Sequence, residues 1–342
     1  AAPRAPAPRT TGERRAPTTV ATTHDRGEAQ QLYAAGRYFA AKRTADGLRQ
    51  AIERFERAVE VDPQFAPAWA ELADAYALLN WYVEPPPPDA FEKGLAAARR
   101  GVEADDTLAE AHASLAFIKT HYERDWEGAD AEFRRAIELN PESAISRRWY
   151  AFSLSAMGRH DEALAQAMRA QELSPRSGVM AMAVANVLFH ARRYDEAVAQ
   201  CHRALELDPG SVAAHVVMRW SYEMMGRHEE ALAIYEKESA FAGDTPTTRA
   251  KYAHMLAAAG RADEARAILS ELTSGRADQW VTAYELGLIY ALLGDADEAF
   301  KWLYRARDER AVGLTFIGVD PHVDALRDDP RFARLLRETG IK

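Results

Sequence analysis

The sequence predicts an all-α fold, a right-handed superhelical solenoid of about eight helix-turn-helix repeats that ends in a C-terminal helical cap. Three observations support this prediction. Alanines recur every 34 residues over six repeats, glycines recur with the same period, and three repeats end in prolines at equivalent positions. A period of this length is typical of helix pairs that stack on their neighbours. The alanines are Ala129, Ala163, Ala197, Ala231, Ala265 and Ala299.

Each recurring residue type has a physical reason within the repeat. Glycine is placed where the first helix ends, because it accepts the left-handed conformation found at helix C-termini. Acidic residues come just before the alanines, where they favour the positive N-terminal end of the second helix. The small alanine lets the two helices approach closely, and one pair cannot bury its apolar face without a neighbour. The glycine positions are Gly158, Gly226, Gly260 and Gly294, with Arg192 in the remaining repeat.

The pattern divides the chain into three parts. Residues 1–24 are rich in Pro, Thr, Ala and Arg without apolar periodicity, which predicts a flexible linker. Residues 25–313 form the repeat array, and its third repeat is one residue longer than the period. Residues 314–342 depart from the pattern and are expected to cap the last apolar face. The repeats are predicted at about 28–65, 66–108, 109–143, 144–177, 178–211, 212–245, 246–279 and 280–313.

Charge and composition argue against some classes of binding partner. A net charge of -9 argues against nucleic acid and anionic membranes, which attract basic surfaces. No apolar run reaches bilayer length, so we expect a soluble chain without membrane insertion. The single cysteine, Cys201, excludes an internal disulfide framework. The chain begins at Ala1 without Met, which suggests a mature product or a fragment. Bacterial cytoplasm and periplasm both stay open as the compartment, and so does the oligomeric state.

No residue set predicts an enzyme. The Asp-Glu-Ala and Glu-Glu-Ala triplets recur in five repeats at a helix start, which is typical of a structural role, and no nucleophile-elbow sequence is present. The ten histidines lack the spacing of metal ligands: His228 has no second His one turn on, and His112 and His121 are too far apart to share a helical turn. We therefore predict no catalytic residue, no cofactor and no metal site.

The repeat resembles the tetratricopeptide repeat (TPR), a protein-binding module. The second predicted repeat carries Trp69, Leu72, Ala73 and Tyr76 in the first-helix pattern of that family, and the Ala and Pro positions of the second helix recur at its period. The resemblance covers most of the chain and implies a scaffold that binds other proteins.

A narrower resemblance concerns the two ends. Residues 29–79, with AIERFERAVEVDP and LADAYALL, and the tail FIGVDPHVDALRDDPRFARLL are similar to the C-terminal TPR region of bacterial multidomain signalling proteins. In that group the repeats follow a serine/threonine kinase, an adenylate cyclase or a winged-helix domain. The chain carries none of the motifs of those effector domains. The resemblance implies a sensory or partner-recognition module.

The family resemblance also implies a binding surface. In TPR arrays the first helix of each repeat lines the concave groove at repeat positions 2, 5, 6, 9, 12 and 13. Aromatic and Met side chains with polar neighbours, as found there, are typical of a groove that anchors a peptide. The mapped residues are Arg148, Trp149, Phe152, Met182, Asn186, Phe189, His190, Val217, Trp220, Glu223, Met224, Lys251 and His254, followed by Tyr284 and Leu288 in repeat eight.

Two alternatives stay open at this point. The superhelix could be tight enough for these side chains to pack against adjacent helices rather than a ligand. The chain could also be a structural accessory subunit of a larger assembly that uses its convex face or its linker. A clamp for chaperone C-termini is incomplete, since only Asn186 and Arg148 fit its chemistry. The leading prediction is a protein or peptide ligand bound in the groove.

Overall fold

A computed structural model describes residues 22–83, 85–274 and 280–341, and it confirms the all-α solenoid. Every regular element in these ranges is helical. Residues 1–21 of the predicted linker lie outside the described residues. The helix pairs are α1 (Thr23–Ala40) with α2 (Ala45–Val61), α3 (Ala66–Tyr82) with α4 (Ala90–Ala104), α5 (Ala109–Ile118) with α6 (Trp126–Leu139), α7 (Ala144–Ala156) with α8 (His160–Leu173), α9 (Gly178–His190) with α10 (Tyr194–Leu207), α11 (Val212–Met224) with α12 (His228–Ala242), α13 (Pro246–Ala258) with α14 (Ala262–Leu272), and α15 (Ala283–Leu292) with α16 (Ala296–Asp308).

The recurring small residues do what the sequence predicts. All six alanines of the 34-residue series are at most 1% exposed, so the second helix of each pair packs through them. The glycines that end the first helices have φ between +71° and +75°, and Arg192 adopts φ +62° at the equivalent place. The turns are therefore left-handed in all these repeats, at a strain cost in the one that uses arginine.

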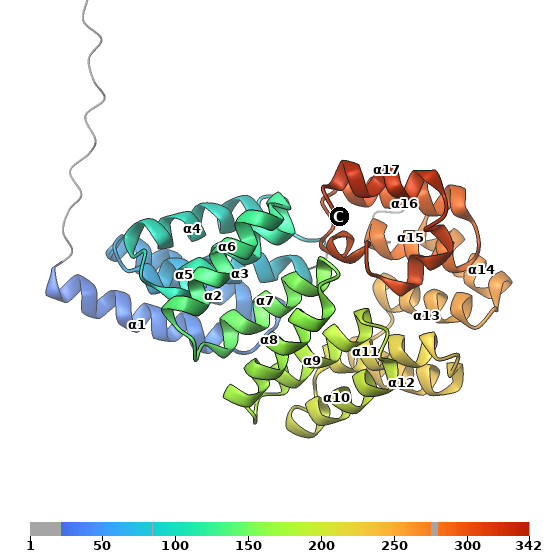
Figure 1. Cartoon of the computed structure of the whole chain (residues 1–342), viewed down its shortest axis with the longest axis horizontal. Helices are drawn as coiled ribbons and strands as arrows, with labels where there is room; N and C mark the ends of the chain where they lie inside the picture. Colours follow the sequence, from blue (N-terminus) through green and yellow to red (C-terminus); the bar gives the residue numbers. More distant parts are fainter. Residues whose placement is uncertain (1–21, 84, 275–279, 342) are drawn as a thin grey trace, which may run out of the picture.

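The odd-numbered helices form the inner layer of the solenoid. Consecutive odd helices contact one another from α1 to α11 and again between α13 and α15, whereas each even helix packs on its own partner and, except for α14, on the helix that follows. The even helices therefore lie outside. The array curves as it proceeds, so that the C-terminal helices come back toward the third repeat (Figure 1).

The extra residue of the third repeat is absorbed by a change of helix type. After α5 the chain forms a π-helical turn, η1 (Lys119–Glu123), which ends at Arg124 with φ +54°. A π-helical turn accommodates one inserted residue without breaking the helix. This turn carries His121, which is 2% exposed on the inner side of the array.

The C-terminal residues both cap the last repeat and enter the concave side. Helix α17 (Pro330–Thr339) packs on α16, where the Tyr304 hydroxyl donates to the Arg331 carbonyl at 3.3 Å. Before it, the 3₁₀ turns η2 (Val312–Phe316) and η3 (Pro321–Leu326) contact the inner helices α7 and α15 and the π-helical turn. Residues 312–329 are called the C-terminal segment below.

The end of the chain also reaches the third repeat directly. The Trp126 indole Nε1 donates to the carbonyl of Gly340 at 2.5 Å. The two residues are far apart in sequence, so this contact closes the curve of the solenoid. The sequence predicted a cap here but not the entry of residues 312–329 into the concave side.

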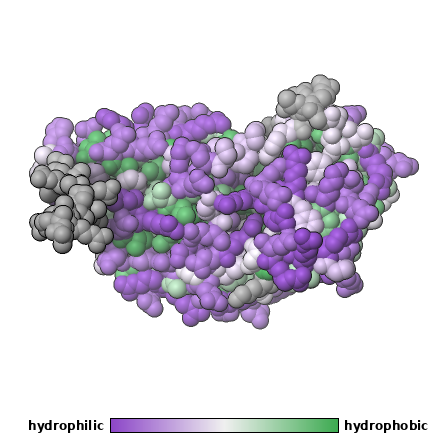
Figure 2. All heavy atoms as spheres, turned by 90° about the horizontal axis from the view of Figure 1, so that it is seen from above, coloured by the Kyte–Doolittle hydropathy of each residue, from purple (hydrophilic) through white to green (hydrophobic). Residues whose placement is uncertain are grey.

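The face of the molecule seen in Figure 2 is mainly hydrophilic, with small hydrophobic patches on the side of the N-terminal repeats. Among the described helices, none combines the length and the apolar character that crossing a membrane requires.

Candidate functional site in the concave groove

The thirteen groove residues predicted in repeats four to seven lie on the inner helices α7, α9, α11 and α13, and Tyr284 and Leu288 of repeat eight lie buried on α15; none of the fifteen is exposed. The buried ones among the thirteen are Trp149, Phe189, His190, Val217, Glu223 and His254. The half-buried ones are Arg148, Phe152, Met182, Asn186, Trp220, Met224 and Lys251. Much of this burial comes from the chain's own C-terminal segment.

Phe316 of the C-terminal segment inserts among aromatic side chains of the groove. Its ring packs edge-on against Phe152 at a centroid distance of 4.7 Å and stacks on His190 at 4.7 Å. His121, from the π-helical turn, lies 6.3 Å from the same ring. Edge and stacked geometries of this kind stabilise aromatic pairs beyond their buried area. Phe316 therefore fills the groove between α7 and α9.

His322 fills the next part of the groove, toward α11 and α13. Its ring lies 5.7 Å from Phe189, 5.7 Å from Trp220 and 4.8 Å from His254. The C-terminal segment thus occupies the groove with two rings, one apolar and one polar. The polar ring brings a set of ionisable groups with it.

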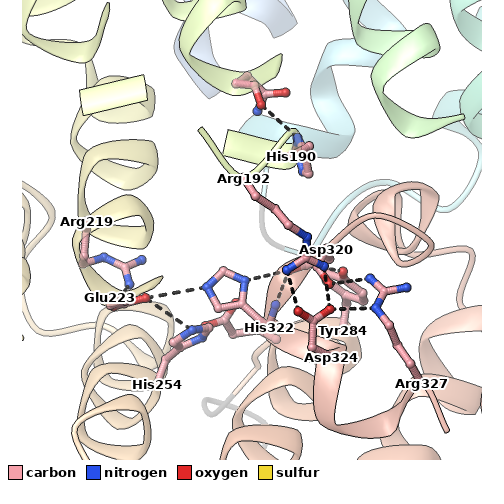
Figure 3. Close-up of polar contacts among 12 residues, drawn as sticks. His190, Arg192, Arg219, Glu223, His254, Tyr284, Asp320, His322, Asp324 and Arg327 are labelled. Carbon is pink, nitrogen blue, oxygen red and sulfur yellow. Dashed lines mark hydrogen bonds and ion pairs between the residues drawn. The ribbon is translucent and has the colours of Figure 1, made fainter. Parts of the chain in front are cut away.

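His322 meets two other buried side chains, Glu223 and His254, and the three come from three different elements (Figure 3). Glu223 Oε2 on α11 lies 3.6 Å from His254 Nε2 on α13 and 3.7 Å from His322 Nε2 on η3. Their side chains are at most 1% exposed. The other ring nitrogens face carboxylates: His254 Nδ1 lies 3.0 Å from Glu285 Oε1, and His322 Nδ1 lies 2.7 Å from Asp320 Oδ1. Two imidazole nitrogens and one carboxylate oxygen are a set of ligand atoms that commonly coordinates a transition metal.

The opposite charges of this cluster stabilise one another. The Arg219 guanidinium, 1% exposed, lies 2.7 Å from Glu223 Oε1. Burial opposes the charge of Glu223, but Arg219 and the two imidazoles outweigh it and lower the pKa of the carboxyl to about 2. Burial likewise opposes a charge on His322, but Asp320 and Glu223 raise its pKa to about 10. At neutral pH Glu223 is therefore ionised and His322 carries a proton, which a bound cation would have to displace.

Half-exposed ion pairs connect the edge of the C-terminal segment to the repeats; we call this edge, formed by Arg192, Asp324 and Arg327, the rim. Arg192 donates to both carboxylate oxygens of Asp324 at 2.5 and 2.7 Å. Arg327 donates to Asp324 at 2.6 Å and to the Gly318 carbonyl at 2.8 Å. These side chains are half exposed, so they position the segment more than they stabilise it.

The groove beyond the C-terminal segment has a different character. Asp74 Oδ1, Arg148 Nε and Asn186 Oδ1 are buried atoms that find no hydrogen-bond partner among the described residues. Burial raises the pKa of Asp74 to about 7, and burial lowers the pKa of Arg148 to about 9. The Arg148 guanidinium stacks on the Trp149 ring at 3.5 Å. Donors and acceptors are therefore left unpaired along this part of the inner surface.

Sequence reasoning placed the inner-helix residues but missed those that the C-terminal segment contributes. Phe316, Asp320 and His322 come from outside the repeats, and Glu285 lies at no mapped groove position. The one available signal was a tail that departs from the repeat and carries Asp-Pro-His. The sequence does not reveal the cluster of Glu223, His254 and His322, because its members come from three distant elements rather than from one short motif.

Comparisons with known proteins agree with this fold. Two family models of the tetratricopeptide repeat match the chain, one over residues 188–253 and the other over 122–177 and 153–212. No curated protein sequence matches. Residues 122–253 thus match tetratricopeptide-repeat models, and the described chain has the fold of a TPR-like solenoid.

Several solved structures resemble the chain. A thermophilic TPR protein of Thermus thermophilus is 22% identical, with 56% of this chain and 98% of that chain covered and a TM-score of 0.47. A TPR protein from Parabacteroides merdae is 15% identical, with coverage of 79% and 99% and a TM-score of 0.49. The human IFIT1 dimer with PPP-AAAA is 17% identical, with coverage of 77% and 68% and a TM-score of 0.53. Likeness at these identities concerns the fold alone.

Proposed function

We propose that the chain is a protein-binding scaffold whose concave groove receives a segment of a partner protein. One observation carries the proposal: the groove already holds a polypeptide, its own C-terminal segment. Phe316 sits between Phe152 and His190, as an anchoring side chain of a bound peptide would. A groove built to take such rings suits recognition of protein segments.

The partner would lie along α3, α7 and α9, beside the C-terminal segment. There Asp74, Arg148 and Asn186 offer both acceptors and donors with no partner in the described chain. A buried polar group without a partner costs about 1–3 kcal/mol. The amides and side chains of a bound segment would remove that cost, and Met182 would add an adaptable apolar contact.

The wider role that we propose is the sensory or partner-recognition module of a bacterial signalling protein. This part rests on the resemblance of residues 29–79 and 316–336 to the C-terminal TPR regions of such proteins. The competing role is an accessory subunit that uses its convex face or its linker, and it makes the opposite prediction about which surface touches the partner.

A photocrosslinking experiment in the source cells separates the two surfaces. A benzophenone amino acid replaces Met182 on the inner helix α9 or, as the matched control, Met168 on the outer helix α8, which is 49% exposed. We expect a discrete adduct from position 182 and none from position 168. Adding Arg148→Ala and Asn186→Ala to the position-182 chain should lower the adduct yield about tenfold.

The opposite pattern contradicts the proposal. An adduct from position 168 alone would place the partner on the convex face and favour the accessory subunit. An adduct from position 182 that is unchanged by the Arg148 and Asn186 substitutions would mean that the groove contact is incidental. Circular dichroism of each variant checks that the helices are intact.

A further inference from the structure

We propose that Glu223, His254 and His322 bind one divalent transition-metal ion, with Zn²⁺ the preferred ion. The three ligand atoms, Glu223 Oε2, His254 Nε2 and His322 Nε2, lie within 4.8 Å of one another. All three are buried, and within the described chain none of them has a hydrogen-bond partner. Two imidazoles and a carboxylate that share one small buried space form a ligand set.

The spacing suits tetrahedral coordination. Zn–N and Zn–O bonds of about 2.1 Å give edges of about 3.4 Å between the ligand atoms of a tetrahedron. The two distances from Glu223 Oε2 to the imidazole nitrogens are 3.6 and 3.7 Å. These separations are long for hydrogen bonds and close to the tetrahedral edge. The third separation, between His254 Nε2 and His322 Nε2, is within 4.8 Å, so the two rings would move toward each other when they bind the ion.

Each histidine has the outer contact that metal-binding histidines typically make. Such residues donate their other ring N–H to a carboxylate or carbonyl, which fixes the tautomer and orients the ring. Here Glu285 faces Nδ1 of His254 at 3.0 Å and Asp320 faces Nδ1 of His322 at 2.7 Å. Asp320 is itself held by the Tyr284 hydroxyl, which donates at 2.6 Å. Both Nε2 atoms are therefore directed at Glu223.

The charge of the cluster matches a divalent ion. Four carboxylates, those of Glu223, Glu238, Glu285 and Asp320, stand against two cations, Arg219 and Lys251. With neutral imidazoles this leaves two negative charges in a buried space, which costs free energy unless it is balanced. One divalent cation balances it, and two protons on the histidines are the competing solution.

The ligand types and the burial specify the kind of site. Imidazole with carboxylate suits Zn²⁺ better than Mg²⁺ or Ca²⁺, which prefer oxygen ligands. Three protein ligands leave a fourth coordination position, which a water molecule would occupy, and the burial of all three ligands, which keeps substrate away, indicates a structural role for the ion. The ion would join η3 to α11 and α13 and so hold the C-terminal segment in the groove. The metal site does not depend on whether the groove binds a partner.

The test uses the full chain without an affinity tag, dialysed against a chelator. Calorimetric titration with ZnCl₂ and elemental analysis should show one Zn²⁺ per chain, bound with a dissociation constant of about 1 μM or tighter. Co²⁺ should give the visible absorption of a tetrahedral site, and this spectrum needs no variant. A wild-type chain that binds neither ion would overturn the proposal and leave protons or a buried water to hold the cluster.

Variants assign the ligands. His254→Ala and His322→Ala should lose the tight site, whereas His202→Ala, an exposed histidine on α10, should bind like the wild type. Asp320→Asn keeps the three ligands and should weaken binding about 10- to 100-fold. Retention of tight binding by both alanine variants would place the ion elsewhere and refute the assignment. Should the alanine variants fail to fold by circular dichroism, the Asp320→Asn affinity decides, and an unchanged value contradicts the site.

Hydrogen exchange reports the structural consequence. Because His322 alone comes from the C-terminal segment, Zn²⁺ should slow amide exchange in residues 312–329 more than in α1 and α2. Equal exchange with and without Zn²⁺ in that segment would show that no ion ties it to the array.

Discussion

The two parts of the concave groove bury charged side chains in different ways. In the part covered by the C-terminal segment, the buried charges of the described residues have opposite charges beside them, as with Arg219 and Glu223 at 2.7 Å. We call the region along α3, α7 and α9 beside the C-terminal segment the open part. There Asp74 and Arg148 keep buried side-chain atoms without a hydrogen-bond partner among the described residues. Both parts nevertheless hold unpaired buried atoms: Glu223 Oε2, His254 Nε2 and His322 Nε2 converge on one point under the C-terminal segment, whereas those of Asp74, Arg148 and Asn186 lie beyond it.

The difference indicates where a partner is needed. Unpaired buried polar atoms are rare in folded proteins because each one costs free energy. The C-terminal segment lowers that cost in part, because Asp320 faces His322 Nδ1 at 2.7 Å, and the atoms still unpaired there are the proposed metal ligands. Beyond the segment, Ser114 and Arg148 act on the Asp74 carboxylate, but Asp74 Oδ1 and Arg148 Nε keep no hydrogen-bond partner in the described chain. The open part is thus the better candidate for a ligand from outside, and three experiments sharpen this comparison.

The largest effect is expected from Phe316→Ala. Loss of a ring that is 6% exposed and packed on Phe152 and His190 should lower the free energy of unfolding by about 3 kcal/mol. Urea denaturation measures the loss, and hydrogen exchange should show residues 312–329 released first. The control Met168→Ala, at a 49% exposed side chain, should change stability by less than about 0.5 kcal/mol. Equal effects of the two substitutions would mean that the segment is not seated as described.

An intermediate effect is expected from Asp74→Asn, and it depends on pH. The pKa of Asp74 is about 7 in the folded chain and 3.8 for an ordinary Asp, so the folded state binds more protons between these values. The contribution of Asp74 to the free energy of unfolding therefore falls as pH rises from 4 to 7 and is constant above.

The Asn variant lacks this dependence. Its stability relative to the wild type should rise by about 2–3 kcal/mol between pH 5 and pH 8. Urea midpoints at the two pH values measure the change, and Asp161→Asn on the exposed side of α8 serves as the control. A relative stability that does not move with pH would mean that Asp74 is not desolvated in the open part.

The smallest effect concerns the rim of the covered part. Arg192→Ala and Arg192→Gly both remove the half-exposed ion pair with Asp324, which should cost less than about 1 kcal/mol. The glycine variant also relieves the φ of +62° and should be more stable than the alanine variant by about 1 kcal/mol. Chemical denaturation of the two variants measures the difference. A loss of several kcal/mol in both would mean that the rim, rather than Phe316, holds the segment.

Sequence alone determined the fold because the solenoid is built from local, repeated contacts. The buried alanines, the left-handed turns and the stacking of helix pairs each follow from residues less than one repeat apart. The groove positions implied by the TPR resemblance lie on inner helices, as Arg148, Met182 and Asn186 do. Some of the mapped residues are buried by neighbouring side chains and these three are half-buried, and partner binding by them stays a prediction.

Tertiary structure decided what fills the groove. The position of Phe316 between α7 and α9, and the meeting of Glu223, His254 and His322, depend on the curvature of the whole array and on the path of a tail outside the repeats. Curvature is the sum of small rotations between successive repeats, and no short motif encodes it. Residues 31 and 99 positions beyond Glu223 therefore reach it only when all the intervening helices have packed.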